Sequence, residues 1–317
     1  MTSVSTRKLV IEPRRPFQLL DWRELAEYRD RNVVVCAAGG GPESAVNTDG
    51  NEKERLQSGP AAWVSGAALA QRTAMWWNPA STKLAYFRFD ESKVPDFYIT
   101  QDETKLQTKV DVEAYPKPGV PNPVVDLFVY DLATKRTVHV DVRDGKPFTN
   151  DVVGHYVYDM SWSPDGKKML FSDAELNLWV VDLATGKQTH VDQGNYTWPN
   201  RDLAPSWSPD SKWIAYQKRL LGSQFHAVFV YNVVANATRQ LTDGLSDVID
   251  PTWDTSGKYL LFLASTDFAL NTGWLDMSSY QRPVERAVYL AVLSKSEPSP
   301  LLPEPGDEPG DTAHKPA

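Results

Sequence analysis

Short runs of alternating hydrophobic and polar residues, separated by polar turns, make up most of this chain. A period of two predicts β-strands rather than helices. The clearest example begins at Trp162. The turn Ser163–Gly166 contains a Pro with a fixed φ and a Gly that tolerates positive φ, so a tight reversal is expected there. Strands are then predicted at Lys168–Phe171, Leu176–Leu183 and Gln188–Val191, each antiparallel to the one before it.

The same pattern occurs four times, as a Trp, a polar turn and a short apolar strand. The four copies begin at Met75, Met160, Pro205 and Pro251. Trp207 follows Trp162 by 45 residues, and Trp253 follows Trp207 by 46. A four-stranded propeller blade has roughly this length, about 40–50 residues. The sequence therefore predicts an all-β fold, a β-propeller or partial propeller of about four four-stranded blades.

The first blade departs from this period. Trp162 follows Trp77 by 85 residues, because a Pro-rich insertion lies between Arg88 and Val124. An incomplete ring would leave strand edges without partners, and such edges pair readily with other chains. Self-association through open blade edges is therefore expected.

The two ends of the chain differ from the blades. Asp21–Arg31 has the pattern of a short amphipathic helix with Asp21 as its N-cap. Gly39–Gly41 lacks the Lys of a phosphate-binding loop and is interpreted as a flexible linker. The residues from Leu301 onward are rich in Pro, Gly and acidic side chains, which is typical of disorder. The predicted organisation is a helix and linker (1–46), the blades (47–300) and a tail (301–317).

The net charge of the chain and its lack of long apolar runs indicate which classes of binding partner to expect. The formal net charge is -8, from 33 basic and 41 acidic side chains. Nucleic acids and anionic membranes select for clustered Lys and Arg, so neither is expected as the main partner. No signal peptide is recognised in Met1–Val10, and no apolar run has the length of a membrane span. A peptide or protein partner and a cytoplasmic location are the resulting expectations.

The sequence indicates no metal or cofactor site. Cys36 is the single cysteine, which excludes an internal disulfide and a multi-Cys metal site. The five histidines are scattered: His139, His155, His190, His226 and His314. His139 and His190 occupy the same place in successive blades, which predicts a repeated structural role.

Residues from about 47 to 157 resemble the propeller of the dipeptidyl peptidase IV family of serine exopeptidases. The matching motifs are Trp63-Val64, MWWNP at Met75–Pro79, LAYFRFDESKVPDFY at Leu84–Tyr98 and AYPKPGVPNP at Ala114–Pro123. From about 162 to 304 the chain resembles a propeller of tricorn-type proteases, on WPNRDLAPSWSPDSKWIAY at Trp198–Tyr216 and GWLDMSSYQRPVERAVYLAVL at Gly273–Leu293. Residues 9–30 faintly resemble the lead of ABC-type polysaccharide-export permeases. An ordinary gene and a chimeric sequence both remain open at this point.

The first resemblance implies a site for the amino terminus of a peptide. In that family a short helix after Trp-Val-Tyr has two consecutive glutamates, which hold a substrate ammonium through its three donors and full charge. Here the aligned residues are Ala67 and Ala68, with Ser65 in place of the tyrosine. This amine clamp is therefore lost. Peptide binding is predicted instead along the propeller face near Arg88, Asp90, Glu91 and Tyr98.

No catalytic site is predicted in these residues. The catalytic domain of that family has a G-x-S-x-G nucleophile elbow, and no G-x-S-x-G occurs in the 317 residues. Two functions stay open. The chain is either the non-catalytic propeller portion of a serine peptidase, gating or binding peptide substrate, or a stand-alone interaction module with no peptidase role.

Overall fold

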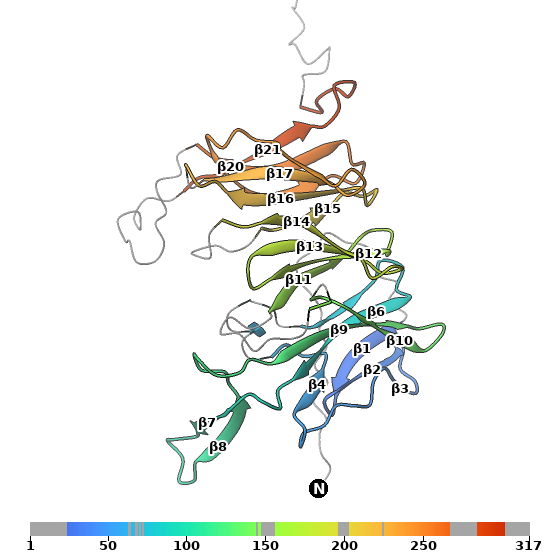
Figure 1. Ribbon diagram of the computed structural model, residues 1–317, viewed down its shortest axis with the longest axis vertical. Helices are drawn as coiled ribbons and strands as arrows, with labels where there is room; N and C mark the ends of the chain where they lie inside the picture. Colours follow the sequence, from blue (N-terminus) through green and yellow to red (C-terminus); the bar gives the residue numbers. More distant parts are fainter. Residues whose placement is uncertain are drawn as a thin grey trace, which may run out of the picture. The chain divides into compact units, whose positions relative to one another are not determined.

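The computed structural model describes residues 24–62, 65–66, 69, 71, 73–143, 145–146, 156–195, 203–223, 225–266 and 284–301. The chain divides into two compact units, one of residues 1–201 with 236–238 and one of residues 202–235 with 239–317. The named elements of both units are β-strands, as the alternating pattern predicts (Figure 1). All strand pairs with a described register are antiparallel.

The first unit contains an N-terminal sheet, a first blade with an inserted hairpin, and a second blade. The N-terminal sheet has the order β1(Glu24–Arg29), β2(Asn32–Ala37), β3(Ser44–Ala45). The first blade has the order β10(Arg136–Val140), β9(Val124–Asp131), β6(Lys83–Asp90), β4(Leu56–Ser58), and β5(Met75–Trp77) also pairs with β6. The hairpin is β7(Asp96–Gln101) with β8(Lys109–Ala114). The second blade has the order β11(Val157–Trp162), β12(Lys168–Asp173), β13(Asn177–Asp182), β14(Gln188–Gln193).

The second unit contains the third and fourth blades. The third has the order β15(Ser206–Trp207), β16(Trp213–Arg219), β17(His226–Asn232), β18(Ala237–Gln240). The fourth has the order β19(Asp247–Trp253), β20(Tyr259–Ser265), β21(Ala287–Val292), so three of its strands are described. The prediction of about four blades in an all-β fold is confirmed. The Pro-rich insertion of the first blade contains the β7–β8 hairpin, which the sequence did not reveal.

The N-terminal helix prediction was wrong. Glu24–Arg29 is strand β1, and it pairs with β2 through a tight turn at Asp30 and Arg31, which have φ of 47° and 66°. The β-branched run after the turn decides this outcome, because Val33 and Val35 are buried against the first blade beside Leu84 and Tyr86. Asp21 lies outside the described residues. Gly39–Gly41 forms the connection between β2 and β3 rather than an interdomain linker.

Gly50 follows the N-terminal sheet in the chain and packs closely against the turn of that sheet. A Cβ on Gly50 would lie 2.2 Å from the main-chain oxygen of Arg31. The Gly50 N–H instead approaches closely and donates to Oδ1 of Asn32 at 2.7 Å. Only a residue without a side chain can make this contact.

Each blade makes its first turn in the same way. A polar side chain directly after the blade Trp accepts a hydrogen bond from the N–H five residues later, at 2.8–2.9 Å. These capping residues are Asn78, Ser163, Ser208 and Asp254. The residue three positions after each cap has a positive φ, between 54° and 70°. The tight turn predicted at Ser163–Gly166, with a Gly at positive φ, is therefore confirmed. The side-chain cap and its repetition in all four blades were not predicted.

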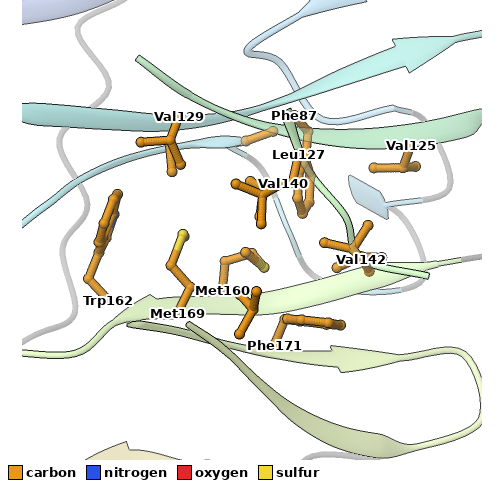
Figure 2. Close-up of a cluster of buried hydrophobic side chains, with 14 of the residues drawn as sticks. Phe87, Val125, Leu127, Val129, Val140, Val142, Met160, Trp162, Met169 and Phe171 are labelled. Atoms are coloured by element: carbon orange, nitrogen blue, oxygen red, sulfur yellow. The ribbon is translucent and has the colours of Figure 1, made fainter. Parts of the chain in front are cut away.

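The core of the first unit lies between its two blades. Figure 2 shows Phe87, Leu127 and Val140 of the first blade pointing toward Met160 and Phe171 of the second. These side chains come from alternate positions of their strands, so they occupy one face of each sheet. Burying this face against the neighbouring blade is the main source of stability available to the unit.

Candidate functional site

A cluster of charged side chains lies on the first blade around Asp126 of β9. Oδ1 of Asp126 accepts a hydrogen bond from Nη2 of Arg143 at 2.8 Å, and Oδ2 accepts one from Nη2 of Arg88 at 3.1 Å. Nη1 of Arg88 also donates to Oδ2 of Asp49 at 3.0 Å. Nε2 of His139 lies 3.5 Å from Asp126. The two carboxylates balance the two guanidinium groups, so the cluster is electrically neutral when His139 is neutral.

The register of the sheet brings these residues together. Arg88 of β6 is directly opposite Asp126 of β9, so a cross-strand ion pair forms at this position. The guanidinium of Arg88 also lies over the ring of Phe128, with 5.3 Å from Cζ to the ring centroid. Burial opposes ionisation of Asp126, but hydrogen bonds and charges from Arg143 and Arg88 outweigh it and lower its pKa. The carboxylate form is therefore favoured in the folded protein.

Arg88 was predicted to bind substrate, and the structure gives its side chain partners within the protein. Both of its terminal nitrogens are used by Asp49 and Asp126. Its Nε is buried and has no hydrogen-bond partner among the described residues. A ligand carboxylate would have to displace one of the two acidic partners before Arg88 could hold it by both terminal nitrogens.

Asp90 and Glu91 lie at the end of the same strand. Oδ1 of Asp90 accepts the N–H of Ser92 at 2.9 Å, which caps the turn after β6. Glu91 is only 6% exposed, and its Oε1 accepts a hydrogen bond from Nε2 of Gln57 at 3.0 Å. Burial raises the pKa of Glu91, against the opposing effect of the Gln57 hydrogen bond. Asp90 and Glu91 therefore each accept a hydrogen bond from within the protein.

Tyr98 is placed differently from the other three predicted site residues. It lies on β7 in the two-stranded sheet, and 65% of its surface is exposed. Among the described residues, no hydrogen bond, ion pair or ring contact links it to Arg88, Asp90 or Glu91. Of the four, Tyr98 has the side chain most open to a ligand.

The position of the lost amine clamp is described only in part. Ala67 and Ala68 lie outside the described residues. Next to them, Ser65 and Gly66 are helical, and Leu69 N–H donates to the Ser65 carbonyl at 3.2 Å. The amide nitrogen and oxygen of the Gln71 side chain are buried without a hydrogen-bond partner in the described part of the chain.

The sequence missed a second charged cluster, in the second unit. Oδ1 of Asp247 accepts hydrogen bonds from the N–H of His226 at 3.0 Å and from its Nδ1 at 2.8 Å. Oδ2 accepts one from Nη2 of Arg286 at 2.6 Å. Burial opposes ionisation of Asp247, but its hydrogen bonds with His226 and Arg286 lower its pKa to about 2. The spacing of these three residues in the sequence did not reveal the cluster, because His226, Asp247 and Arg286 come from three different strands or connections.

The paired histidines have the repeated structural role that the sequence predicted. His139 of β10 is opposite Phe128, with ring centroids 5.2 Å apart, and His190 of β14 is opposite Trp179 at 5.0 Å. Each histidine thus covers an aromatic ring of the third strand of its blade. Over the described ranges, no group of three or more His, Cys, Asp or Glu side chains is arranged to hold a metal ion. No helix described here has the length and hydropathy needed to cross a membrane.

The family model of the dipeptidyl peptidase IV (DPP IV) N-terminal region matches residues 21–313 of the chain. The chain belongs to this family. The match is continuous across both units, including the residues likened above to tricorn-type proteases and the end of the permease-like stretch. DPP IV N-terminal region blades thus account for the repeated Trp-and-turn pattern.

Individual relatives cover parts of the chain. Probable dipeptidyl-aminopeptidase B of Aspergillus fumigatus is 31% identical over 177 residues, which are 50% of this chain and 19% of that protein. Dipeptidyl peptidase 4 of Bos taurus is 26% identical over 170 residues, which are 50% of this chain and 22% of that protein. The chain therefore spans about a fifth of the length of these curated relatives.

A solved structure supports the fold. Dipeptidyl peptidase 4 of Porphyromonas gingivalis superposes with a TM-score of 0.67 at 22% sequence identity, over 86% of this chain and 36% of that one. At this identity the likeness concerns the fold alone. It agrees with the blade architecture of this DPP IV N-terminal region.

Proposed function

We propose that this chain acts as the substrate-admitting propeller portion of a DPP IV-type serine peptidase, where it binds or gates peptides for a catalytic domain. The observation that carries the proposal is the family match over residues 21–313. The named relatives are dipeptidyl peptidases and aminopeptidases, so peptides are the substrate class to test. Arg88, Asp90, Glu91 and Tyr98 remain the predicted peptide-binding residues.

The chain differs from its family at the two positions that would bind the amino terminus of a peptide. With Ala67 and Ala68 in the positions of the two glutamates, nothing at these positions can neutralise a substrate ammonium. Peptide binding by this chain is therefore proposed to depend little on a free amino terminus. A chimeric origin, with a tricorn-type propeller from about residue 162 to 304, is a separate part of this proposal.

A binding assay tests this function. Fluorescent Xaa-Pro peptides with free and acetylated amino termini are titrated against the purified chain. We expect similar affinity for the two forms, and a preference for the free amine once Ala67→Glu and Ala68→Glu are introduced together. Tyr98→Ala should weaken binding, whereas Tyr28→Ala, at another exposed tyrosine (45%), should not. Absence of peptide binding, together with unchanged turnover by a fused family hydrolase domain, contradicts the proposal.

The alternative function is a stand-alone interaction module without a peptidase role. The same Ala67-Ala68 departure favours it, because a propeller that has lost its amine clamp can still present loops to a protein partner. The hydrolase fusion separates the two functions. A module gives the fused domain no advantage in peptide turnover, whereas a substrate-admitting propeller does.

A further inference from the structure

Arg88 has two carboxylate partners, which are held in different ways. The Asp126 side chain is 12% exposed and is shared with Arg143, whose Nη2 donates to its Oδ1 at 2.8 Å. The Asp49 side chain is 44% exposed, and within the described ranges Arg88 is the one cation paired with it. Asp126 is therefore the fixed partner of Arg88, and Asp49 is the partner that a ligand can replace.

Rotation of one side chain is enough to remove Asp49 from Arg88. The main chain beside Asp49 is anchored, because the Gly50 N–H donates to Oδ1 of Asn32 at 2.7 Å. A second bond to the Asp49 carboxylate comes from Nδ2 of Asn47, at 2.6 Å and exposed to solvent. Water replaces such an exposed hydrogen bond at little cost. Arg88 can therefore be released while the connection that contains Asp49 stays in place.

Release of Asp49 leaves the cluster with an unbalanced positive charge. The two guanidinium groups of Arg88 and Arg143 then face a single carboxylate, that of Asp126. The excess is one positive charge, and it becomes two when His139, 3.5 Å from Asp126, is protonated. An anion is needed to restore neutrality, and Asp49 supplies it in this structure.

The guanidinium of Arg88 keeps its position when Asp49 leaves. Asp126 holds it from the opposite position on β9, and the ring of Phe128 lies beneath it, 5.3 Å from Cζ to the ring centroid. The Arg88 side chain is 30% exposed, so a ligand can reach it. Each terminal nitrogen of an arginine carries two hydrogens. Nη2 can therefore keep its bond to Asp126 while Nη1 and the second hydrogen of Nη2 hold a carboxylate by two parallel hydrogen bonds.

We propose that Arg88 binds a carboxylate of a peptide ligand, and that Asp49 occupies this site when the ligand is absent. The carboxylate comes from the C-terminus of the peptide or from an acidic side chain. With Ala67 and Ala68 at the positions of the amine clamp, the peptide is then held by a negative group rather than by its amino terminus. The choice of a peptide as the ligand rests on the proposed function, whereas the anion site depends on the cluster alone.

A peptide titration tests the competition between Asp49 and the ligand. Fluorescent acetyl-Ala-Pro-Ala is used with a C-terminal carboxylate or a C-terminal amide. We expect Asp49→Ala to tighten binding of the acid about fivefold and to leave the amide unchanged, because a partly exposed ion pair no longer competes. The amidated peptide acetyl-Ala-Pro-Glu distinguishes the two sources, since its carboxylate lies on a side chain alone.

The chain contains a matched control for this substitution. Asp96 is 43% exposed and pairs with Nη2 of Arg55 at 2.7 Å, so Asp96→Ala removes a similar ion pair outside the cluster. Asp96→Ala should change the affinity for neither peptide. Equal effects of Asp49→Ala on acid and amide, or equal effects of the two substitutions, overturn the proposal.

Arg88→Lys tests the two parallel hydrogen bonds. The substitution keeps the positive charge, but an ammonium does not match a carboxylate with two parallel donors. In the Asp49→Ala background we expect the preference for the acid over the amide to disappear, with thermal melting as the check that the variant is folded. A retained preference in the folded variant would refute the role of Arg88.

Acetate tests the anion site without a peptide. Asp49→Ala should lower the melting temperature, and sodium acetate should restore it more than sodium chloride of equal ionic strength, because an anion that binds the folded state stabilises it. Asp96→Ala should show no such difference between the salts. Rescue by acetate without any peptide binding supports the anion site and contradicts the proposed peptide function. Peptide binding with neither rescue nor a preference for the acid leaves that function standing and overturns the present inference.

Discussion

The indole N–H of Trp162 donates a hydrogen bond to the main-chain oxygen of Trp76, at 3.1 Å and 86 residues away in sequence. In the second unit Trp253 makes the equivalent bond to Ser206, at 3.2 Å. In both units the blade Trp therefore ties its strand to the start of the preceding blade. The repeated Trp has a structural role in addition to its apolar surface.

Replacing Trp162 by Phe should reduce the free energy of unfolding by about 1–2 kcal/mol, because the Trp76 carbonyl loses its donor while most packing is retained. Urea denaturation measures the change. Trp207→Phe is the control, since the Trp207 indole N–H is buried and has no hydrogen-bond partner among the described residues. Equal losses in the two variants would mean that packing alone explains the effect.

Asp126→Asn should destabilise the first unit by about 2 kcal/mol, a typical value for hydrogen bonds to charged groups. The substitution removes the charge that Arg88 and Arg143 share and leaves the cluster with an excess of positive charge. Asp111→Asn on the exposed hairpin serves as the control in the same denaturation experiment. A stability unchanged by Asp126→Asn contradicts a structural role for the cluster.

Glu91→Gln should stabilise the protein at neutral pH. Because the folded-state pKa of Glu91 is raised by burial, ionisation favours the unfolded chain once the pH rises above the ordinary value of 4.5. The gain should be a few degrees in melting temperature at pH 7, and it should disappear below about pH 4. Thermal melts at several pH values measure it, with the exposed Glu103→Gln as reference. A gain that is independent of pH argues against this cause.

Asp247 should make the second unit sensitive to acid. Its folded-state pKa of about 2 is below the ordinary 3.8, so its contribution is complete above pH 3.8 and is lost as the pH falls toward 2. We expect Asp247→Asn to cost about 2 kcal/mol at neutral pH and the difference from the unaltered protein to shrink over that interval. Urea unfolding between pH 2 and 6 measures this, compared with the exposed Asp243→Asn. A constant difference over this range would count against the assignment.

Local chemistry made much of the fold predictable. The alternation, the Trp spacing and the Ser-Pro-Asp-Gly turn predict blades because each depends on residues close in sequence. The equivalent positions of His139 and His190 predict a shared role for the same reason. The N-terminal prediction failed because Asp21–Arg31 has both helical periodicity and a tight turn within reach of Asn32–Ala37, and burial of Val33 and Val35 selected the strand pair.

The candidate site was predicted less well. The family motif located Arg88, Asp90 and Glu91 in one segment, but it could not reveal that Asp49, Asp126 and Gln57 bind their side chains. Cross-strand partners 30 or more residues apart depend on sheet register. The cluster of His226, Asp247 and Arg286 depends on the same kind of information and left no motif in the sequence.

The sequence by itself determined the repeating unit of this protein: strands of period two, a tight polar turn after the blade Trp, and the number of blades. The tertiary structure alone decided which charges neutralise one another and that Glu24–Arg29 is a strand rather than a helix. Both outcomes depend on register and burial, which are properties of strands that meet in space rather than of residues that follow one another in the chain.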